Sequence, residues 1–185
     1  MQTEVFLAGF GGQGVMFAGQ VLSYAAMDTG KEVTWIPSYG PEMRGGTANC
    51  TVVIADEEIG SPLVQNPPAT IIMNLPSLDK YESMVKPGGV LIVNSSMVDR
   101  DVTRTDITWV SVPCNEIAEE AGDRRMANVV ATGALLALLP VLSLKEIEDA
   151  LYAHMPGRHK NLLPQNVEAL KRGADYAKQH AHMAK

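Results

Sequence analysis

Two glycine-rich segments are the part of this chain best suited to chemistry, because each follows a short run of residues typical of a β-strand. The first is residues 9–14 (GFGGQG) and the second is residues 37–47 (PSYGPEMRGGT). Glycines let a backbone turn tightly and approach a ligand, and a helix that starts after the first segment offers free N–H donors. In open α/β sheets, ligands bind beyond the carboxyl ends of the strands. The two segments therefore predict one site for an anionic, phosphate-bearing group or for a partner subunit.

The first segment matches the G-x-G-x-x-G fingerprint of dinucleotide-binding sites, with glycines at 9, 11 and 14. NAD-binding domains carry an acidic residue at the end of the next strand. The corresponding residues 34–37 (TWIP) include neither an acid nor an arginine, which disfavours a nicotinamide site. Two other interpretations stay open: a tight turn that packs a helix against the sheet, or a cradle for another phosphate or for the edge of a partner's cofactor.

The phosphate interpretation assigns the anion-facing N–H groups to four residues: Gly11, Gly12, Gln13 and Gly14. The side-chain amide of Gln13 could add a further donor. In the second segment, the Arg44 guanidinium could reach a phosphate or carboxylate bidentately, or it could pair locally with Glu42. Tyr39 either lines the pocket or packs. The residues that would complete the pocket or dock onto a partner are Ser38, Tyr39, Arg44, Gly45, Gly46 and Thr47.

The spacing of apolar residues predicts one α/β domain over residues 1–185, a Rossmann-like, mostly parallel sheet flanked by helices, with a helical C-terminal third. The expected strands are residues 5–8, 32–36, 49–55, 70–73, 90–93 and 107–112, the second of them ended by Pro37. Helices are expected at residues 15–26, at residues 78–85 and from residue 115 onward. In this last part, Ser143 and Glu146 form a capping-box pattern. Asn128 either points into the pocket or is a satisfied buried amide.

Composition narrows the class of function. The chain has 185 residues, of which 46% are hydrophobic, and a net charge of −6, so it is expected to fold globularly and not to bind nucleic acid. Its four histidines and its basic clusters at 124–125 and 158–160 are expected on the solvated surface. The apolar stretch at 126–144 includes Asn, Thr, Gly, Pro and Ser, which indicates a buried core helix and not a membrane span.

The two cysteines, Cys50 and Cys114, are too few for an iron–sulfur cluster, which needs about four thiolates. Cys50 is expected to be a buried strand residue, and Cys114 could start a helix with a mildly lowered pKa. Free thiols, together with the lack of a basic N-terminal leader, fit a cytoplasmic protein.

Around the two glycine-rich segments, the chain resembles the gamma subunit of 2-oxoacid:ferredoxin oxidoreductases. The likeness is carried by residues 9–15 (GFGGQGV) and 37–50 (PSYGPEMRGGTANC). It continues through residues 59–62 (IGSP), 74–77 (NLPS), 86–89 (KPGG), 94–95 (NS) and Asn128. The SYGPEMRGG run looks nearer the 2-oxoglutarate type than the pyruvate type, and the branched-chain type stays open.

The resemblance implies that residues 1–185 form one gamma-type catalytic domain of a complex that oxidatively decarboxylates a 2-oxoacid, forms an acyl-CoA and reduces ferredoxin. In such complexes, thiamine diphosphate and its magnesium lie between the alpha and beta subunits. The iron–sulfur clusters lie in beta or in a ferredoxin-like delta subunit. This chain would contribute structure and contact with CoA through the residues named above, and it would supply no metal ligand, acid, base or nucleophile.

Two other functions stay open. One is a stand-alone Rossmann-type module that binds CoA or a nucleotide. The other is an NAD(P)- or FAD-dependent oxidoreductase, which the missing acid after the second strand disfavours.

Overall fold

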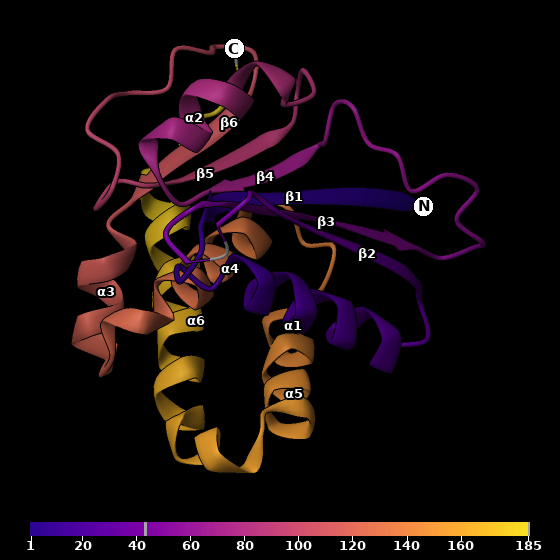
Figure 1. The fold of residues 1–185 in the computed structure, drawn as a ribbon, viewed down its shortest axis with the longest axis vertical. Coiled ribbons are helices and arrows are strands. Elements are labelled where there is room, and N and C mark those ends of the chain that lie inside the picture. The colour runs from indigo at the N-terminus through magenta and orange to yellow at the C-terminus, as the bar shows by residue number, and fades with distance from the viewer. Residues whose placement is uncertain (43, 185) are drawn as a thin grey trace.

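The computed structural model describes residues 1–42 and 44–184. Its strands are β1 (Gln2–Phe10), β2 (Glu32–Tyr39), β3 (Thr47–Ala55), β4 (Ala69–Ile72), β5 (Val90–Asn94) and β6 (Thr108–Val112). Its α-helices are α1 (Val15–Asp28), α2 (Leu75–Tyr81), α3 (Cys114–Ala121), α4 (Ala127–Leu138), α5 (Leu144–His154) and α6 (Leu163–His180). Short 3₁₀ segments are η1 (Glu82–Met84), η2 (Arg124–Met126) and η3 (Gly157–Leu162). The prediction of an α/β chain with a helical C-terminal third is confirmed (Figure 1).

The strands form one six-stranded sheet in the order β2-β3-β1-β4-β5-β6. The pairs β1–β4, β4–β5 and β5–β6 are parallel, whereas β3 is antiparallel to both β1 and β2. Because β1 and β2 both run opposite to β3, they run in the same direction as each other. The prediction of a mostly parallel sheet is thus confirmed. In a Rossmann unit β1 and β2 would be neighbours, but here β3 lies between them, which the sequence patterns did not predict.

The predicted end of the second strand at Pro37 is wrong, since β2 continues to Tyr39 and β3 begins at Thr47. Gly40 N–H donates to Thr47 O at 2.8 Å, so Gly40 and Thr47 form a hydrogen-bonded pair of the antiparallel ladder. Such pairs alternate with unbonded ones along a ladder. Pro37 therefore occupies an unbonded position of an edge strand, where its missing N–H breaks no ladder bond.

The two faces of the sheet are covered differently. Helices α1, α4 and α6 lie against one face, with α5 packed on α1, and α2 lies against the other face (Figure 1). Alternate residues of β1 divide between two cores: Val5 and Leu7 join the cluster under α1, whereas Phe6 and Ala8 join the cluster under α2. Because α1 follows β1 and α2 follows the neighbouring strand β4, the connections switch faces between these two strands. Ligands of open α/β sheets bind at the carboxyl side of such a switch point.

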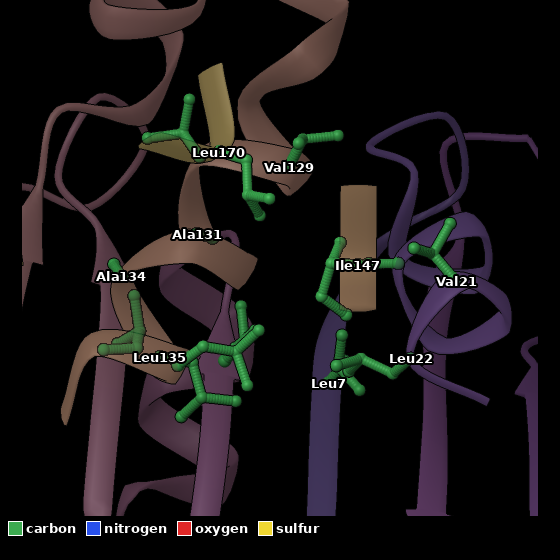
Figure 2. Packing of buried hydrophobic residues seen from close by; sticks show 14 of the residues in the cluster. Leu7, Val21, Leu22, Val129, Ala131, Ala134, Leu135, Ile147 and Leu170 are labelled. Carbon is green, nitrogen blue, oxygen red and sulfur yellow. The ribbon is translucent and has the colours of Figure 1, made fainter. Parts of the chain in front are cut away.

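The larger core lies under α1, α4, α5 and α6. Figure 2 labels Leu7 of β1, Leu22 of α1 and Ile147 of α5 within this cluster, and each of the three side chains is 1% exposed or less. Each Å² of apolar surface removed from water contributes about 25 cal/mol to the free energy of folding. This cluster is therefore the main stabilising element of the fold.

Helices α4 and α6 approach each other backbone to backbone. A Cβ atom added to Gly133 of α4 would overlap the carbonyl oxygen of Leu170, and one added to Gly173 of α6 would overlap that of Val130. The crossing therefore depends on these two glycines. It brings the N-terminal end of α4, and with it Asn128, to the start of α1.

Two further local predictions can be compared with the structure, one on the cap of α5 and one on the start of α2. The capping box of α5 is confirmed, since Ser143 Oγ accepts from Glu146 N–H and the Glu146 carboxylate accepts from Ser143 N–H. The helix expected at 78–85 begins earlier, at Leu75, because the Asn74 side chain caps it by accepting from Ser77 N–H. Among the described residues, none of the helices combines the length and the apolar character that a membrane crossing requires.

Candidate functional site

The two glycine-rich segments meet at the carboxyl ends of β1 and β2. We call residues 9–14 together with residues 40–42 and 44–46 the glycine loop pair. Gly11 N–H donates to Gly46 O at 2.8 Å, and Gly45 N–H donates to Gly11 O at 3.2 Å. A Cβ atom at Gly46 would overlap the Glu42 carbonyl oxygen, so the second loop closes this tightly only with glycine there. The reversed strand β3 is what brings the two loops into contact.

The first loop is also held by hydrogen bonds of Gln13. Gln13 N–H donates to Phe10 O at 3.1 Å. The Gln13 side chain accepts from Phe10 N–H at 3.0 Å and donates to Met73 O at 2.8 Å, which ties the loop to the end of β4. Gly11 N–H and the Gln13 amides are therefore engaged within the protein.

Among the described residues, no partner is recorded for the N–H groups of Gly12 and Gly14. These two groups, with the first-turn amides of α1, are the donors that remain for an anion. Two of the four predicted donors therefore serve the fold, and two have no recorded partner among the described residues.

Gly14 and Asn128 join the first loop to α4. Gly14 is the residue before α1 and has a φ of 75°, in the left-handed region that favours glycine. Asn128 Nδ2 donates to Gly14 O at 3.0 Å, and a Cβ atom at Gly14 would lie 2.6 Å from that nitrogen. Asn128 is 4% exposed, so it is a buried, hydrogen-bonded amide that also lines a cavity at the start of α1.

Two hollows flank the N-terminus of α1, and we call them the helix-side cavities. One has a volume of about 300 Å³ and is lined by residues of the loop pair together with Tyr39 and Met16. The other has a volume of about 270 Å³ and is lined by Asn128, Arg125 and His159 among others. Gly14 belongs to the wall of both. An anionic ligand in either would meet the positive end of the α1 dipole.

Arg125 and His159 are site candidates that sequence reasoning placed only on the solvated surface. Both are exposed, as expected, but both also line the cavity that holds Asn128. Arg125 pairs with Asp123 at 2.6 Å, and this hydrogen bond lowers the pKa of the Asp123 carboxyl. A signal was present in the sequence, since Arg125 lies only three residues before Asn128, about one helical turn away.

The remaining predicted residues divide between the two faces of the sheet. Tyr39 lies in the wall of a helix-side cavity, whereas its neighbour Ser38 lines neither helix-side cavity. Successive side chains of a strand point to opposite faces, which accounts for this split. Thr47 lines a cavity on the other face. Met43, part of the predicted second segment, lies outside the described residues.

Arg44 is exposed, and among the described residues its guanidinium has no recorded hydrogen bond or ion pair. The alternative of a local pair with Glu42 is therefore not observed among these residues. The guanidinium is available to an anion or to a partner surface beside the loop pair.

Both cysteines are fully buried. Burial raises the pKa of the Cys50 thiol to about 11 and raises that of Cys114 as well. Cys114 begins α3 as expected, but the suggested lowering of its pKa is wrong, because loss of hydration outweighs the helix start. Neither thiol is a reactive group at neutral pH.

Comparison with known proteins gives a consistent family. Residues 4–176 match the family described as pyruvate ferredoxin/flavodoxin oxidoreductase. Over 97% of its length the chain is 37% identical to ketoisovalerate oxidoreductase subunit VorA of Methanothermobacter marburgensis, but it spans only 37% of that protein. It is also 37% identical to 2-oxoglutarate synthase subunit KorC of Methanocaldococcus jannaschii, covering 97% of this chain and 96% of KorC.

Solved structures agree with these relatives. The gamma subunit of a keto/oxoacid ferredoxin oxidoreductase from Geobacter sulfurreducens superposes with a TM-score of 0.82 at 30% identity, covering 96% of this chain and 99% of that one. A 2-oxoglutarate:ferredoxin oxidoreductase from Magnetococcus marinus, described with 2-oxoglutarate, coenzyme A and succinyl-CoA bound, superposes with a TM-score of 0.87 at 22% identity. The match covers 99% of this chain and 32% of that one. The second likeness is one of fold alone.

Proposed function

The chain belongs to the pyruvate ferredoxin/flavodoxin oxidoreductase family, and from this premise we propose that it is the gamma subunit of a 2-oxoacid:ferredoxin oxidoreductase. The complex would decarboxylate a 2-oxoacid, join the acyl group to CoA and pass two electrons to ferredoxin. Near full-length similarity to a KorC chain and to a gamma subunit supports this role for residues 1–185 as one domain. 2-Oxoglutarate is the first substrate to test, and a branched-chain 2-oxoacid is the second, since a VorA relative is equally similar.

The redox chemistry is assigned to partner subunits. A cluster needs about four thiolates, and this chain has two cysteines, both buried. We therefore place thiamine diphosphate, magnesium and the iron–sulfur clusters on alpha, beta or delta subunits, where they supply the decarboxylation and electron transfer. No residue of this chain is proposed as an acid, base or nucleophile. Two free thiols fit a reducing compartment such as the cytoplasm.

The share of this chain in substrate binding is proposed to be contact with CoA. The observation that carries this proposal is the N-terminus of α1 between the two helix-side cavities, with the N–H groups of Gly12 and Gly14 beside it. Backbone donors and the helix dipole suit the pyrophosphate of CoA. Arg125 in the wall of one cavity and the exposed Arg44 of the loop pair would add positive charge, and Asn128 holds Gly14 in position.

Purification of the chain from its own cells tests the assignment to a complex. Alpha and beta subunits should co-purify, and the complex should reduce a viologen dye in a CoA-dependent manner with one 2-oxoacid of a panel. Activity with 2-oxoglutarate or with 3-methyl-2-oxobutanoate would identify the type. A chain that purifies alone and inactive would instead favour the stand-alone binding module.

Calorimetric titration of the assembled complex with CoA tests the site. Arg125→Ala and Arg44→Ala should each weaken CoA binding, by about tenfold for loss of one charge-assisted hydrogen bond. Gly12→Val should weaken it further, because Gly12 has a φ of 107° and borders the cavity. Lys145→Ala, which removes an exposed lysine of α5, is the matched control. Unchanged affinity in all three site variants would rule out CoA contact by this chain.

A further inference from the structure

A second cavity lies on the opposite face of the sheet from α1. It has a volume of about 480 Å³ and opens between the glycine loop pair and α2, beyond the carboxyl ends of β1 and β4. This is the switch point of the sheet described above, where a ligand is expected on topological grounds. We call it the α2-side cavity. The proposed contact with CoA lies at the start of α1, and this cavity shares with it only residues of the glycine loop pair and the strand ends beside them.

Two polar side chains of this cavity are almost completely buried and yet have an unused donor. Asn74 is 9% exposed, and its Oδ1 accepts from Ser77 N–H at 3.1 Å, which leaves Nδ2 as its second polar atom. Ser77 is 6% exposed. Among the described residues, no partner is recorded for Asn74 Nδ2 or Ser77 Oγ, and neither is among the fully enclosed unpaired atoms. Both therefore reach the cavity whose wall their residues form. Buried polar groups normally have a hydrogen-bond partner.

The charge of the cavity favours an anion. Of the described residues in its wall, only Lys80 is charged. The lining formed by these residues thus has no carboxylate, although the chain has a net charge of −6. Within the described residues Lys80 takes part in no recorded ion pair, while the adjacent Asp79 is paired with Arg100. Lys80 Nζ lies 5.0 Å from the centre of the Tyr81 ring. Asn74, Ser77 and Lys80 follow one another at intervals of three residues, which places them along one side of α2.

We propose that the α2-side cavity binds the phosphate group of a small organic phosphomonoester. The phosphate oxygens accept hydrogen bonds from Asn74 Nδ2, Ser77 Oγ and Lys80 Nζ. The organic part lies against the apolar wall that Phe10, Tyr81 and Met97 supply. A cavity of this volume is within the ordinary range for small ligands. This cavity shares Phe10 and Ala48 with one helix-side cavity, but Asn74, Ser77 and Lys80 line neither helix-side cavity.

Titration of the full-length, ¹⁵N-labelled chain with phenyl phosphate, followed by amide NMR, tests this proposal. Saturable shifts are expected at the amides of Gly45, Gly46 and Ser77, with weaker binding of inorganic phosphate and of benzoate. Lys80→Gln should weaken binding about tenfold, since a charge-assisted hydrogen bond is lost. Lys86→Gln, an exposed lysine outside the cavity wall, should leave it unchanged.

Ser77→Ala is the second variant. It removes Oγ but keeps the backbone N–H that Asn74 caps, so α2 should fold normally while phenyl phosphate binds more weakly. Equal affinity in wild type and in both cavity variants would overturn the proposal. Benzoate binding as tightly as phenyl phosphate would replace it with a carboxylate site. Displacement of phenyl phosphate by CoA would show that the two ligands share one site, and would overturn the proposal of a second site. Loss of CoA binding in the loop-pair variants, with phenyl phosphate binding unchanged, would support two sites.

Discussion

At the scale of single residues, the contact between Gly14 and Asn128 fixes the position of the first residues of α1 relative to α4. It joins residues 114 positions apart in the sequence, and it requires both a positive φ and the absence of a Cβ atom at Gly14. Sequence reasoning left Asn128 as either a pocket residue or a satisfied buried amide. The side chain has both properties, because it bonds to the loop while lining a cavity.

Gly14→Ala is expected to lower the free energy of unfolding by roughly 2–6 kcal/mol, since backbone strain and the contact with Asn128 each cost about 1–3 kcal/mol. Asn128→Ala removes the obstructing amide, so Gly14→Ala should cost about 1 kcal/mol less in that background. Gly30→Ala, at a φ of 79° with no heavy atom within 4 Å of the added Cβ, isolates the strain. Urea unfolding of wild type, the two single variants at Gly14 and Asn128 and the double variant measures the coupling energy. Free-energy changes that simply add would contradict the contact.

At the scale of elements, the crossing of α4 and α6 is the feature that local patterns could not supply. Apolar periodicity predicted helices in this region, but Gly133 and Gly173 carry no local sign that each faces a carbonyl oxygen of the other helix. An interior glycine lowers helix propensity, so the sequence alone marks these positions as weak points. The structure shows that they permit close approach.

Gly173→Ala should therefore destabilise the chain, although alanine favours a helix by about 1 kcal/mol over glycine. Overlap with the Val130 carbonyl forces the helices apart, and overpacking of this kind costs roughly 1–3 kcal/mol or more. Gly157→Ala, whose Cβ would meet no atom within 4 Å, is the control. A thermal melting temperature of the Gly173 variant at or above that of wild type would refute the close contact.

The order of the strands shows what else local patterns omit. Short apolar runs and the glycine turn predicted β1, α1 and the following strand, because burial and turn formation depend on neighbouring residues. They did not predict that β3 inserts between β1 and β2, since strand partners are chosen by contacts between distant segments. Pro37 was read as a strand end because proline lacks an N–H, and only its place on an edge strand makes it tolerable. The meeting of the two loops could be expected from strand ends, but the engagement of Gln13 with Met73 could not.

At the scale of the whole molecule, carboxylates form a group that makes stability depend on pH. Their pKa values are held below the ordinary range in five cases: Asp56, Glu82, Asp106, Glu116 and Asp123. The hydrogen bond from Lys31, with the N-terminal amine, lowers the pKa of Asp56 to about 2. For Glu82, burial alone would raise the pKa, but hydrogen bonds from Thr103 and Arg100 outweigh it.

Because these pKa values are lower in the folded than in the unfolded chain, the unfolded chain binds more protons near pH 4. Their stabilising contribution is complete above about pH 5 and is lost as the pH falls through the folded values. The thermal melting temperature is therefore expected to be steady from pH 7 to pH 5 and to fall below about pH 4.5. A melting temperature that stays level down to pH 3 would contradict this expectation.

Glu82→Gln tests the contribution of Glu82, the buried carboxylate of this group. At pH 7 it should lower the free energy of unfolding by about 1–3 kcal/mol, because the donors around Glu82 lose a charged acceptor. The difference from wild type should narrow as the pH falls, since wild type loses the same charge by protonation. Asp79→Asn removes the exposed carboxylate that shares Arg100 and should have a much smaller effect. Urea unfolding at pH 7 and pH 3.5 measures both differences.

The placement of the outer strands gives the molecule two separate optical reporters. The chain has two tryptophans, Trp35 on β2 and Trp109 on β6, so one lies on each edge of the sheet. Trp35 packs beside Cys50 and under Gly19 of α1, with its Nε1 buried, whereas Trp109 stacks on His182 with ring centres 4.0 Å apart. A Trp109→Phe chain would emit only from beneath α1, and a Trp35→Phe chain only from the C-terminal edge. Fluorescence could then follow events at the two ends of the sheet independently, without an added label.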